Sequence, residues 1–169
     1  KLVRTNNDFL QAAVDMRMTE MNVRKCVFPR WKRGIVPVIT GFIGSCEEGL
    51  TTTLGRGGSD YSGAIFGACF QTQEIWIWTD VSGIYSADPR IVPNASVLKN
   101  VSYEEASEMS YFGAKVIHPK TMMPALMKKI PVRIKNTFAP NDLGTLISEK
   151  RHVAHPVRVV TAITKQSVV

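Results

Sequence analysis

Apolar positions in the first part of the chain recur three or four residues apart, which is the spacing of a helix face. They form two stretches: Phe9, Ala12, Ala13 and Met16, and then Val23, Cys26, Val27 and Trp31. We expect the first helix to start near Asp8, with Asn6 or Asn7 as its cap. Pro29 should kink the second stretch or start a fresh turn, and Gly34 should end it.

The next segments carry the patterns of strands. Residues 35–41 are almost continuously apolar, as in a buried strand of a parallel sheet. A polar turn at 46–49 leads to a second strand at 51–54, and we expect the two strands to form a hairpin. Residues 59–70 predict a helix and residues 74–79 a strand. Because a strand, a helix and a strand follow one another, the pattern predicts a right-handed parallel crossover.

The second half of the chain alternates in the same way. Residues 80–94 contain two prolines, one glycine and no periodicity, and their Tyr and Ile content argues against disorder, so we expect a structured loop. Ser102 and Glu105 have the spacing of a capping box for a helix at 103–112, with Gly113 as its end. The remaining expected elements are a short helix at 122–127 with Pro124 in its first turn, and strands at 132–135 and 145–147.

Composition narrows the class of protein. The 169 residues are 44% hydrophobic and 21% charged, which is ordinary for a globular protein. We find neither a signal peptide nor an apolar run of transmembrane length, and we expect a cytoplasmic protein without a membrane partner. The cysteines, Cys26, Cys46 and Cys69, lack metal or redox spacing and are expected to be reduced thiols.

The formal net charge of +7 favours negatively charged partners. A nucleic-acid partner would require basic residues gathered on one face. Here they are dispersed, and we expect small anions rather than nucleic acid. The basic positions considered are Arg24, Lys25, Arg30, Lys32, Arg33, Lys128, Lys129, Arg151 and Arg158.

A glycine-rich loop between the strand at 51–54 and the helix at 59–70 is the strongest candidate for chemistry. Its glycines allow positive φ and close approach of a ligand to the backbone. Ser59 is a natural N-cap, and the positive end of the helix that follows suits an anion. Arg56 adds a fork that can grip a carboxylate or phosphate with two bonds. A glycine-rich loop between a strand and a helix is a plain turn about as often as it is a binding site. The presence of Arg56, Ser59 and Asp60 in this loop favours a binding site.

The segment from Leu54 to Ser62 resembles the signature of aspartate kinases, within the amino-acid kinase family. Further matches follow in the family's order at 78–85, 87–90, 111–119, 134–137 and 144–147. The resemblance runs from about Val36 to Ser148. The family's amino-terminal Lys-Phe-Gly-Gly phosphate motif is absent, so the chain resembles the carboxy-terminal half of the kinase domain.

This resemblance implies a fold and a domain organisation. We expect an α/β fold of the amino-acid kinase type, a three-layer α/β/α sandwich with a mainly parallel sheet, present as a partial domain. Residues 1–149 would form the carboxy-terminal half of the catalytic domain. Residues 150–169 would form a basic linker and the first strand of a regulatory, ACT-like domain.

The implied activity is transfer of a phosphoryl group from ATP to the side-chain carboxylate of L-aspartate, the entry step to lysine, threonine and methionine. The full-length enzyme is expected to be a homo-oligomer, and this chain alone is expected to be inactive because it lacks the Lys-Phe-Gly-Gly motif. Two alternatives stay open. One is the kinase half of a bifunctional aspartate kinase–homoserine dehydrogenase, and the other is a non-catalytic nucleotide-binding fragment.

Site residues follow from the same resemblance. For aspartate these are Arg56, Gly57, Gly58, Ser59 and Asp60; for the nucleotide they are Thr79, Asp80, Tyr85, Arg90 and Lys115; Lys115 and Asp60 are the expected catalytic residues. Without the resemblance, Asp60 would be a favourable acid in a first helical turn and Tyr85 a core aromatic. Neither His118 nor the two later histidines have metal-ligand spacing. Magnesium is expected to arrive with ATP, held mainly by its phosphates.

Overall fold

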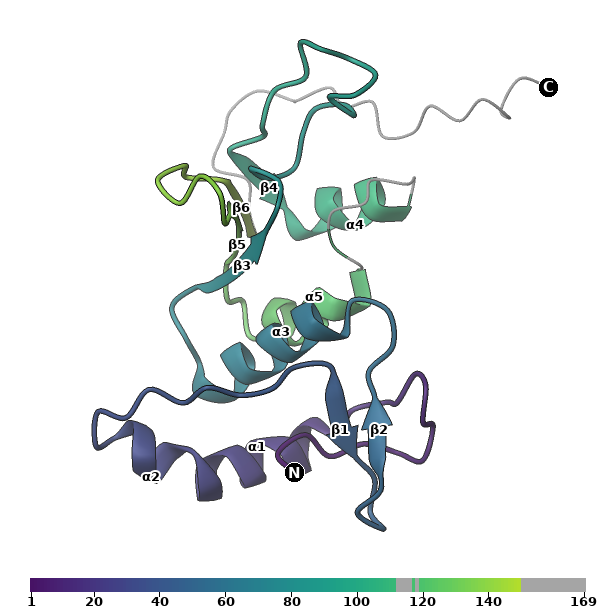
Figure 1. The fold of residues 1–169 in the computed structure, drawn as a ribbon, viewed down its shortest axis with the longest axis vertical. Coiled ribbons are helices and arrows are strands. Elements are labelled where there is room, and N and C mark those ends of the chain that lie inside the picture. The colour runs from purple at the N-terminus through teal and green to yellow at the C-terminus, as the bar shows by residue number, and fades with distance from the viewer. Residues whose placement is uncertain (112–116, 118, 150–169) are drawn as a thin grey trace, which may run out of the picture. The chain divides into compact units, whose positions relative to one another are not determined.

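The chain's architecture comes from a computed structural model that describes residues 1–111, 117 and 119–149. It forms two compact units, residues 1–72 and a second unit that begins at Gln73 (Figure 1). The first unit contains α1 (Met16–Cys26), α2 (Phe28–Trp31), β1 (Ile43–Ser45), β2 (Thr51–Thr53) and α3 (Gly58–Phe70). The second contains β3 (Ile75–Thr79), β4 (Asn100–Ser102), α4 (Tyr103–Tyr111), α5 (Pro119–Met127), β5 (Val132–Asn136) and β6 (Thr145–Ser148).

The start of α1 differs from the prediction. The helix is capped by Asp15, whose carboxylate accepts a hydrogen bond from the N–H of the third helical residue, and it does not begin near Asp8. Asn6 and Asp8 instead accept backbone N–H groups of the preceding loop, including that of Ala13 at 2.9 Å. Such side chains offer the backbone an alternative to a helix. The effect of Pro29 is confirmed, since it lies in the first turn of the separate helix α2.

The predicted hairpin is present, but its first strand is not where the sequence placed it. β1 pairs antiparallel with β2, with Ile43 opposite Thr53. The strand expected at 35–41 is wrong: no strand is assigned there, and Val36 and Val38 are 82% and 99% exposed. No backbone hydrogen bond joins residues 36–41 to another described residue. A strand is stabilised by a hydrogen-bonded neighbour, and an apolar run without one stays outside a sheet.

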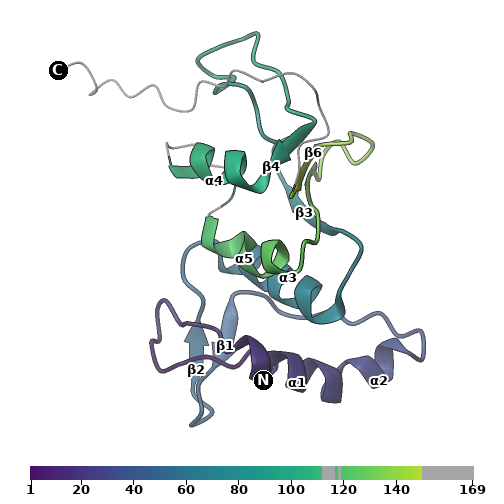
Figure 2. The same cartoon turned by 180° about the vertical axis from the view of Figure 1, so that it is seen from behind.

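A small core fixes the glycine-rich loop of the first unit at both ends. Leu54 is buried just before the loop and Ile65 is fully buried in α3 just after it. Both belong to one apolar cluster that also contains Val3, Val23, Val27 and Cys69. Figure 2 shows α1 and α3 of this unit from behind. The loop is therefore held between packed elements.

The second unit is built on a four-stranded sheet with the order β3-β5-β6-β4. β3 pairs parallel with β5 and β4 with β6, whereas β5 and β6 are antiparallel. The predicted α/β class with a mainly parallel sheet is confirmed. The crossover expected between 51–54 and 74–79 is wrong, because β2 belongs to the separate two-stranded sheet. β4 was not predicted, because its three residues are too few to show a pattern.

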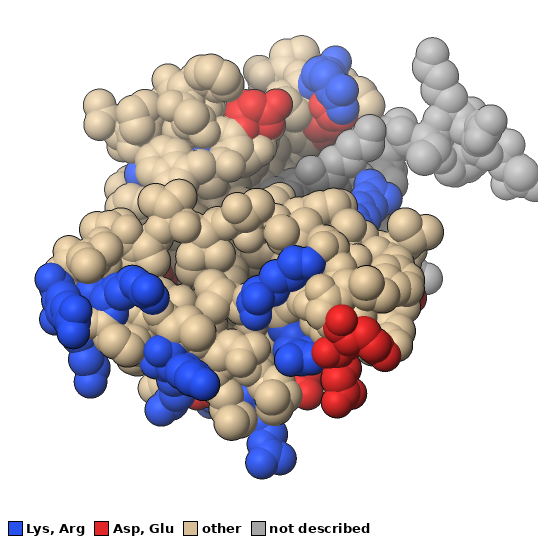
Figure 3. Space-filling model, turned by 60° about the horizontal axis from the view of Figure 1, so that its bottom comes forward, with Lys and Arg blue, Asp and Glu red and all other residues tan. Residues whose placement is uncertain are grey.

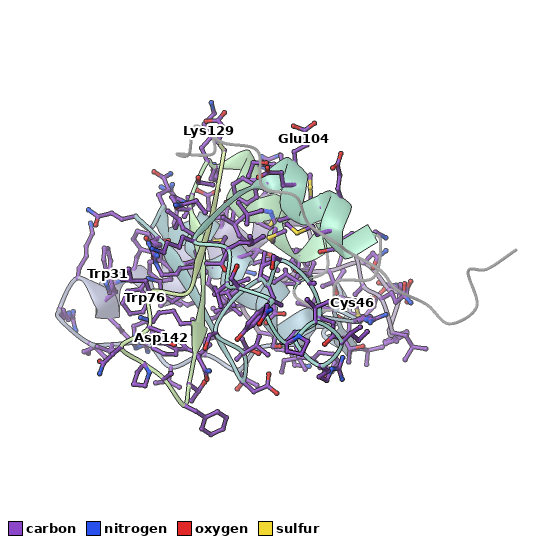
Figure 4. All side chains as sticks on the ribbon, turned by 90° about the horizontal axis from the view of Figure 1, so that it is seen from above. Trp31, Cys46, Trp76, Glu104, Lys129 and Asp142 are labelled. Carbon is purple, nitrogen blue, oxygen red and sulfur yellow. The ribbon has the colours of Figure 1, made fainter. Side chains whose placement is uncertain are left out.

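Of the two helices of the second unit, α4 begins as its sequence predicted and α5 does not. The capping box is confirmed: the N–H of Glu105 donates to Ser102 Oγ at 3.0 Å, and Glu105 Oε2 accepts the N–H of Ser102 at 2.8 Å. Glu104, in the same first turn, points outward (Figure 4). α5 begins at Pro119, earlier than predicted, because proline suits the first helical position. Pro124 therefore lies inside the helix.

On the face shown in Figure 3, Lys and Arg side chains stand in several groups with uncharged surface between them. Cys46 and Cys69 are buried and Cys26 is exposed, and none of these three described cysteines forms a disulfide. Within the described ranges, no helix has the length and apolar content needed to cross a membrane.

Candidate functional site

The glycine-rich loop has a backbone that requires its glycines. Gly55 and Gly57 have φ of +76° and +69°, in the left-handed region that other residues rarely adopt. Gly58 is buried, and a Cβ atom there would lie 2.6 Å from the ring of Phe42. The loop is therefore a specific tight turn, in which the missing side chains of Gly55 and Gly58 leave room for Gln11 and Phe42 to pack against the backbone.

The helix after the loop begins one residue earlier than predicted. Gly57 is its N-cap, and no side chain caps the end, so the assignment of Ser59 as N-cap is wrong. The positive φ of Gly57 turns the chain into the helix before Ser59, which is the second helical residue. The first backbone bond of the helix is from Tyr61 N–H to the Gly57 carbonyl. Among the described residues, no acceptor bonds the N–H groups of Ser59 and Asp60, which leaves two donors at a positive helix end.

The two charged residues of the loop act separately. Arg56 is exposed, and Asp60 is half-buried in the first turn of α3. Burial raises the pKa of Asp60 above its usual value. No ion pair joins Arg56 to Asp60 in the described part of the chain. The idea that Asp60 orients Arg56 therefore has no contact to support it, and the guanidinium is available for a ligand.

In the second unit, Thr79 is the last residue of β3 and Asp80 follows it directly. The Thr79 hydroxyl donates to Asp80 Oδ1 at 3.1 Å. Thr79 lies opposite Asn136 at the end of β5, and Thr137 N–H extends the ladder by donating to the Thr79 carbonyl at 2.8 Å. Because β3 and β5 are parallel, their carboxyl ends meet at one edge of the sheet, where ligands of α/β sheets bind.

The loop after β3 is a closed ribbon. The Leu98 N–H donates to the Ile84 carbonyl at 2.7 Å, and the Ser86 N–H donates to the Ser96 carbonyl at 2.8 Å. Between these bonds Tyr85 forms a bridge with residue 97 and is half-buried. The prediction of a structured loop over 80–94 is confirmed. We call residues 80–98 the ribbon loop.

Arg90 lies at the far end of the ribbon loop and is paired with Asp88. Its Nε and terminal nitrogen donate to the two Asp88 oxygens at 3.0 and 2.7 Å, and this carboxylate raises the pKa of Arg90. A phosphate that uses Arg90 must share or replace Asp88 as its partner. Arg90 is exposed and Asp88 is only partly buried, so such an exchange costs little.

Lys115 and His118 lie outside the described residues. Ser110 precedes Lys115 in the chain and the buried residue Ile117 follows it. The Ser110 hydroxyl donates a hydrogen bond to the carbonyl oxygen of Ile117 at 2.6 Å. The residues that flank the Lys115 segment are thus joined to each other.

Two residues without a predicted role, Asn136 and Thr145, hold the ribbon loop. Asn136 donates from Nδ2 to Ser82 Oγ at 3.0 Å. The Thr145 hydroxyl lies between Ile84 and Leu98, at 2.8 and 2.6 Å from their backbone N–H and carbonyl groups. Asn136 and Thr145 belong to segments that resemble the family, and the position of Asn136 at the end of a strand next to β3 was a signal that could have found it.

The predicted site residues fall into two groups. Residues 56–60 belong to the first unit, whereas residues 79–90 belong to the second. Each group is coherent by itself: the first offers N–H donors and an exposed guanidinium, and the second offers polar groups at a strand end and an aromatic residue whose backbone is bridged to residue 97. The first group suits anionic ligands and the second suits aromatic ones. Both groups are suited to binding rather than to nucleophilic catalysis.

Comparison with known proteins identifies the class. The Amino acid kinase family matches residues 3–136, and the chain belongs to this family. Its relatives within this family include aspartokinases. Lysine-sensitive aspartokinase 3 of Escherichia coli is 43% identical over 150 residues, which are 89% of this chain and 33% of that enzyme. A bifunctional aspartokinase/homoserine dehydrogenase of Buchnera aphidicola is 42% identical over 149 residues, 88% of this chain and 18% of that protein.

Solved structures agree with these relatives. E. coli aspartokinase III in complex with aspartate and ADP has a TM-score of 0.83 and 43% identity, over 89% of this chain and 33% of that one. Aspartate kinase of Clostridium acetobutylicum has a TM-score of 0.76 and 37% identity, over 87% and 32%. The chain thus spans a third or less of the proteins it matches here, and its resemblance to aspartate kinases is confirmed.

Proposed function

We propose that this chain supplies part of the active site of an aspartokinase, which transfers the γ-phosphoryl group of ATP to the side-chain carboxylate of L-aspartate. The observation that carries the proposal is the 43% identity and TM-score of 0.83 to an enzyme whose structure holds aspartate and ADP. The two groups of site residues support it, because one presents donors for carboxylates and the other presents groups for a nucleotide.

The glycine-rich loop is the proposed aspartate site. Aspartate carries two carboxylates and an ammonium group. Arg56 would grip one carboxylate through its two-bonded fork, and the unbonded N–H groups at the start of α3 would receive negative charge. The half-buried carboxylate of Asp60 would accept the ammonium group. Leu54 and Ile65, on either side of these groups in the chain, are anchored in one apolar core.

The edge of β3 and the ribbon loop are the proposed nucleotide site. Thr79 and Asp80 would bond the base or the ribose, and Tyr85 would stack on the base. Arg90 and Lys115 would meet the phosphates. Phosphoryl transfer depends on positioning and on cations at the equatorial oxygens more than on covalent chemistry.

Magnesium enters this proposal with the nucleotide, whose phosphate oxygens would hold it. Among the described residues, no group of three or more His, Cys, Asp or Glu side chains is placed to hold a metal ion. The protein's part would be to hold the nucleotide that carries the ion. Lysine, threonine and methionine synthesis, a homo-oligomeric full-length enzyme and a cytoplasmic location remain parts of the proposal, although some relatives are chloroplastic.

Calorimetric titration tests the assignment directly. We expect the chain to bind ADP, because the segment 79–90 is complete, and to bind aspartate more weakly, because in this family part of the aspartate pocket lies outside the matching half. Inorganic phosphate is the control, since it separates nucleotide binding from attraction of any anion to a chain of charge +7. Binding of aspartate without binding of ADP would contradict the proposal.

Arg56→Lys tests the aspartate site in a completed kinase domain, meaning this chain together with the family's Lys-Phe-Gly-Gly half. Charge is kept, but an ammonium cannot form the two-bonded fork. Loss of one charged hydrogen bond should raise the KM for aspartate about tenfold to a hundredfold, with the KM for ATP unchanged. Arg33→Lys, at another exposed arginine, is the matched control. An unaltered aspartate KM in Arg56→Lys would assign Arg56 to structure alone.

A bifunctional aspartokinase/homoserine dehydrogenase is the second candidate. It is favoured by relatives of that description, including one from Arabidopsis thaliana that is 53% identical over 110 residues. Both candidates use the same kinase chemistry. A dinucleotide-binding fingerprint downstream of the kinase and regulatory segments, read from the complete coding sequence, distinguishes them.

A further inference from the structure

We propose that Thr145 is a positioning residue of the nucleotide site, because its hydroxyl closes the neck of the ribbon loop that carries Tyr85 and Arg90. This inference rests on the proposed function for its ligand, but the neck itself is defined by hydrogen bonds alone.

The neck consists of three connected bonds. Thr145 Oγ1 accepts the N–H of Ile84 at 2.8 Å and donates to the carbonyl of Leu98 at 2.6 Å. The N–H of Leu98 in turn donates to the carbonyl of Ile84 at 2.7 Å. All three residues are buried. One hydroxyl thus joins the two ends of the loop to the first residue of β6.

The buried environment makes this hydroxyl hard to replace. A backbone N–H and a carbonyl that lose their partner in the interior remain unsatisfied, because water does not reach them. Only a side chain that both accepts and donates can serve the two loop ends at once, and a hydroxyl does so. Gly83 supports this reading: its φ is +136°, and a Cβ atom there would overlap Thr145 Oγ1. The chain therefore leaves room for the hydroxyl at this point.

A second set of hydrogen bonds, at Ser82, holds the ribbon loop just before the neck. Asn136, at the end of β5, donates to Ser82, and the Ser82 hydroxyl lies 3.3 Å from Asp142 Oδ2. Asn136 Oδ1 also accepts the N–H of residue 138 at 2.9 Å, so both ends of its amide are fixed. Figure 4 labels Asp142 in the connection between β5 and β6. The antiparallel pair β5 and β6 thus anchors the loop at residues 82 and 84.

These anchors matter for binding because Tyr85 follows Ile84 directly. The position of the Ile84 backbone determines the position of the Tyr85 Cα atom. The neck determines the orientation of the rest of the ribbon loop, which includes Arg90. If the neck opens, the loop samples further conformations, and the apparent affinity falls in proportion to the fraction that stays competent to bind. Thr145 touches no ligand in this account and acts through the loop.

Three variants of the 169-residue chain test the proposal. Thr145→Val keeps the volume but removes both bonds of the hydroxyl, whereas Thr145→Ser keeps the hydroxyl. Ile147→Val is the matched control, since Ile147 is fully buried on the same strand and makes none of the neck bonds. By calorimetry, we expect Thr145→Val to weaken ADP binding about tenfold or more, because two buried hydrogen bonds of the neck are lost, and the other two variants to bind within about threefold of the original chain.

Amide hydrogen exchange without nucleotide gives a readout that does not depend on binding. The amides of Ile84 and Leu98 should exchange faster in Thr145→Val and at the original rate in Ile147→Val. If Thr145→Val does not fold, Thr145→Cys replaces it, because a thiol is only a weak donor and acceptor.

The outcomes separate the two proposals. If the original chain binds ADP and Thr145→Val binds it equally well, the positioning role is overturned and the proposed function stands. If the original chain binds no ADP, the proposed function fails. In that case, an unchanged rate of amide hydrogen exchange at Ile84 in Thr145→Val also contradicts the claim that Thr145 closes the neck, whereas a faster rate supports it.

Discussion

Gly144→Ala is expected to unfold the second unit, with a loss of stability on the order of 4 kcal/mol or more. Gly144 immediately precedes β6 and has φ of +69°. A Cβ atom at this position would overlap the carbonyl oxygen of Ile134 in β5. The substitution thus combines an unfavourable backbone conformation with a steric clash against the main chain.

Relief of this clash would require the sheet to open. Ile134 lies opposite Thr145, and the two strands are joined by the β5–β6 ladder. Ile134 and Thr145 are also almost fully buried, so their backbones cannot shift without disturbing the core. A flexible side chain could move aside, but a paired carbonyl cannot.

Urea unfolding followed by circular dichroism measures the effect. Gly49→Ala is the control, because Gly49 has φ of +82° but nothing within 4 Å of an added Cβ atom. It should lose only about 1–2 kcal/mol, the cost of a left-handed conformation for a residue with a side chain. Similar midpoints for the two variants would mean that β5 and β6 accommodate the methyl group, contrary to our expectation.

The parts of the fold that local chemistry determines could be predicted from sequence. Ser102 and Glu105 lie three residues apart and form their capping box with partners inside that interval. The strands of the four-stranded sheet other than β4 also agree with the apolar pattern. The run 35–41 has the same pattern, but its backbone finds no partner among the described residues. Whether an apolar run becomes a strand depends on a neighbour, which periodicity does not reveal.

The candidate site shows the same division. Motifs identified Arg56 and Tyr85, but only the structure shows that Gly57 rather than Ser59 caps the helix and that Arg90 is already paired with Asp88. These outcomes depend on the φ of one glycine and on a loop turning back on itself. Contacts between residues far apart in sequence, such as Thr145 with Ile84, are set by the tertiary fold, so no spacing rule could have predicted them.

Lys115→Met is expected to lower the kcat of the completed kinase domain by a factor of about a hundred to a thousand. Phosphoryl transfer spreads negative charge over the equatorial oxygens, and fixed cations must meet that charge there. In this family one lysine comes from the Lys-Phe-Gly-Gly motif and a second from the position that Lys115 matches. Methionine keeps the length of the side chain and removes its charge. Because the change affects charge in the transition state, ADP affinity should stay nearly unchanged.

Steady-state kinetics with aspartate and ATP, together with calorimetry for ADP, measure the two effects separately. Lys120→Met is the matched control: Lys120 is an exposed lysine in α5, five residues further along the chain. It should leave kcat unaltered, because a lysine facing solvent is not aimed at the phosphates. Ser110, whose hydroxyl joins the residues flanking the Lys115 segment, stays intact in both variants. Equal kcat values for Lys115→Met and Lys120→Met would show that the transferring phosphoryl group does not depend on Lys115, and that the cation in the Lys-Phe-Gly-Gly half suffices.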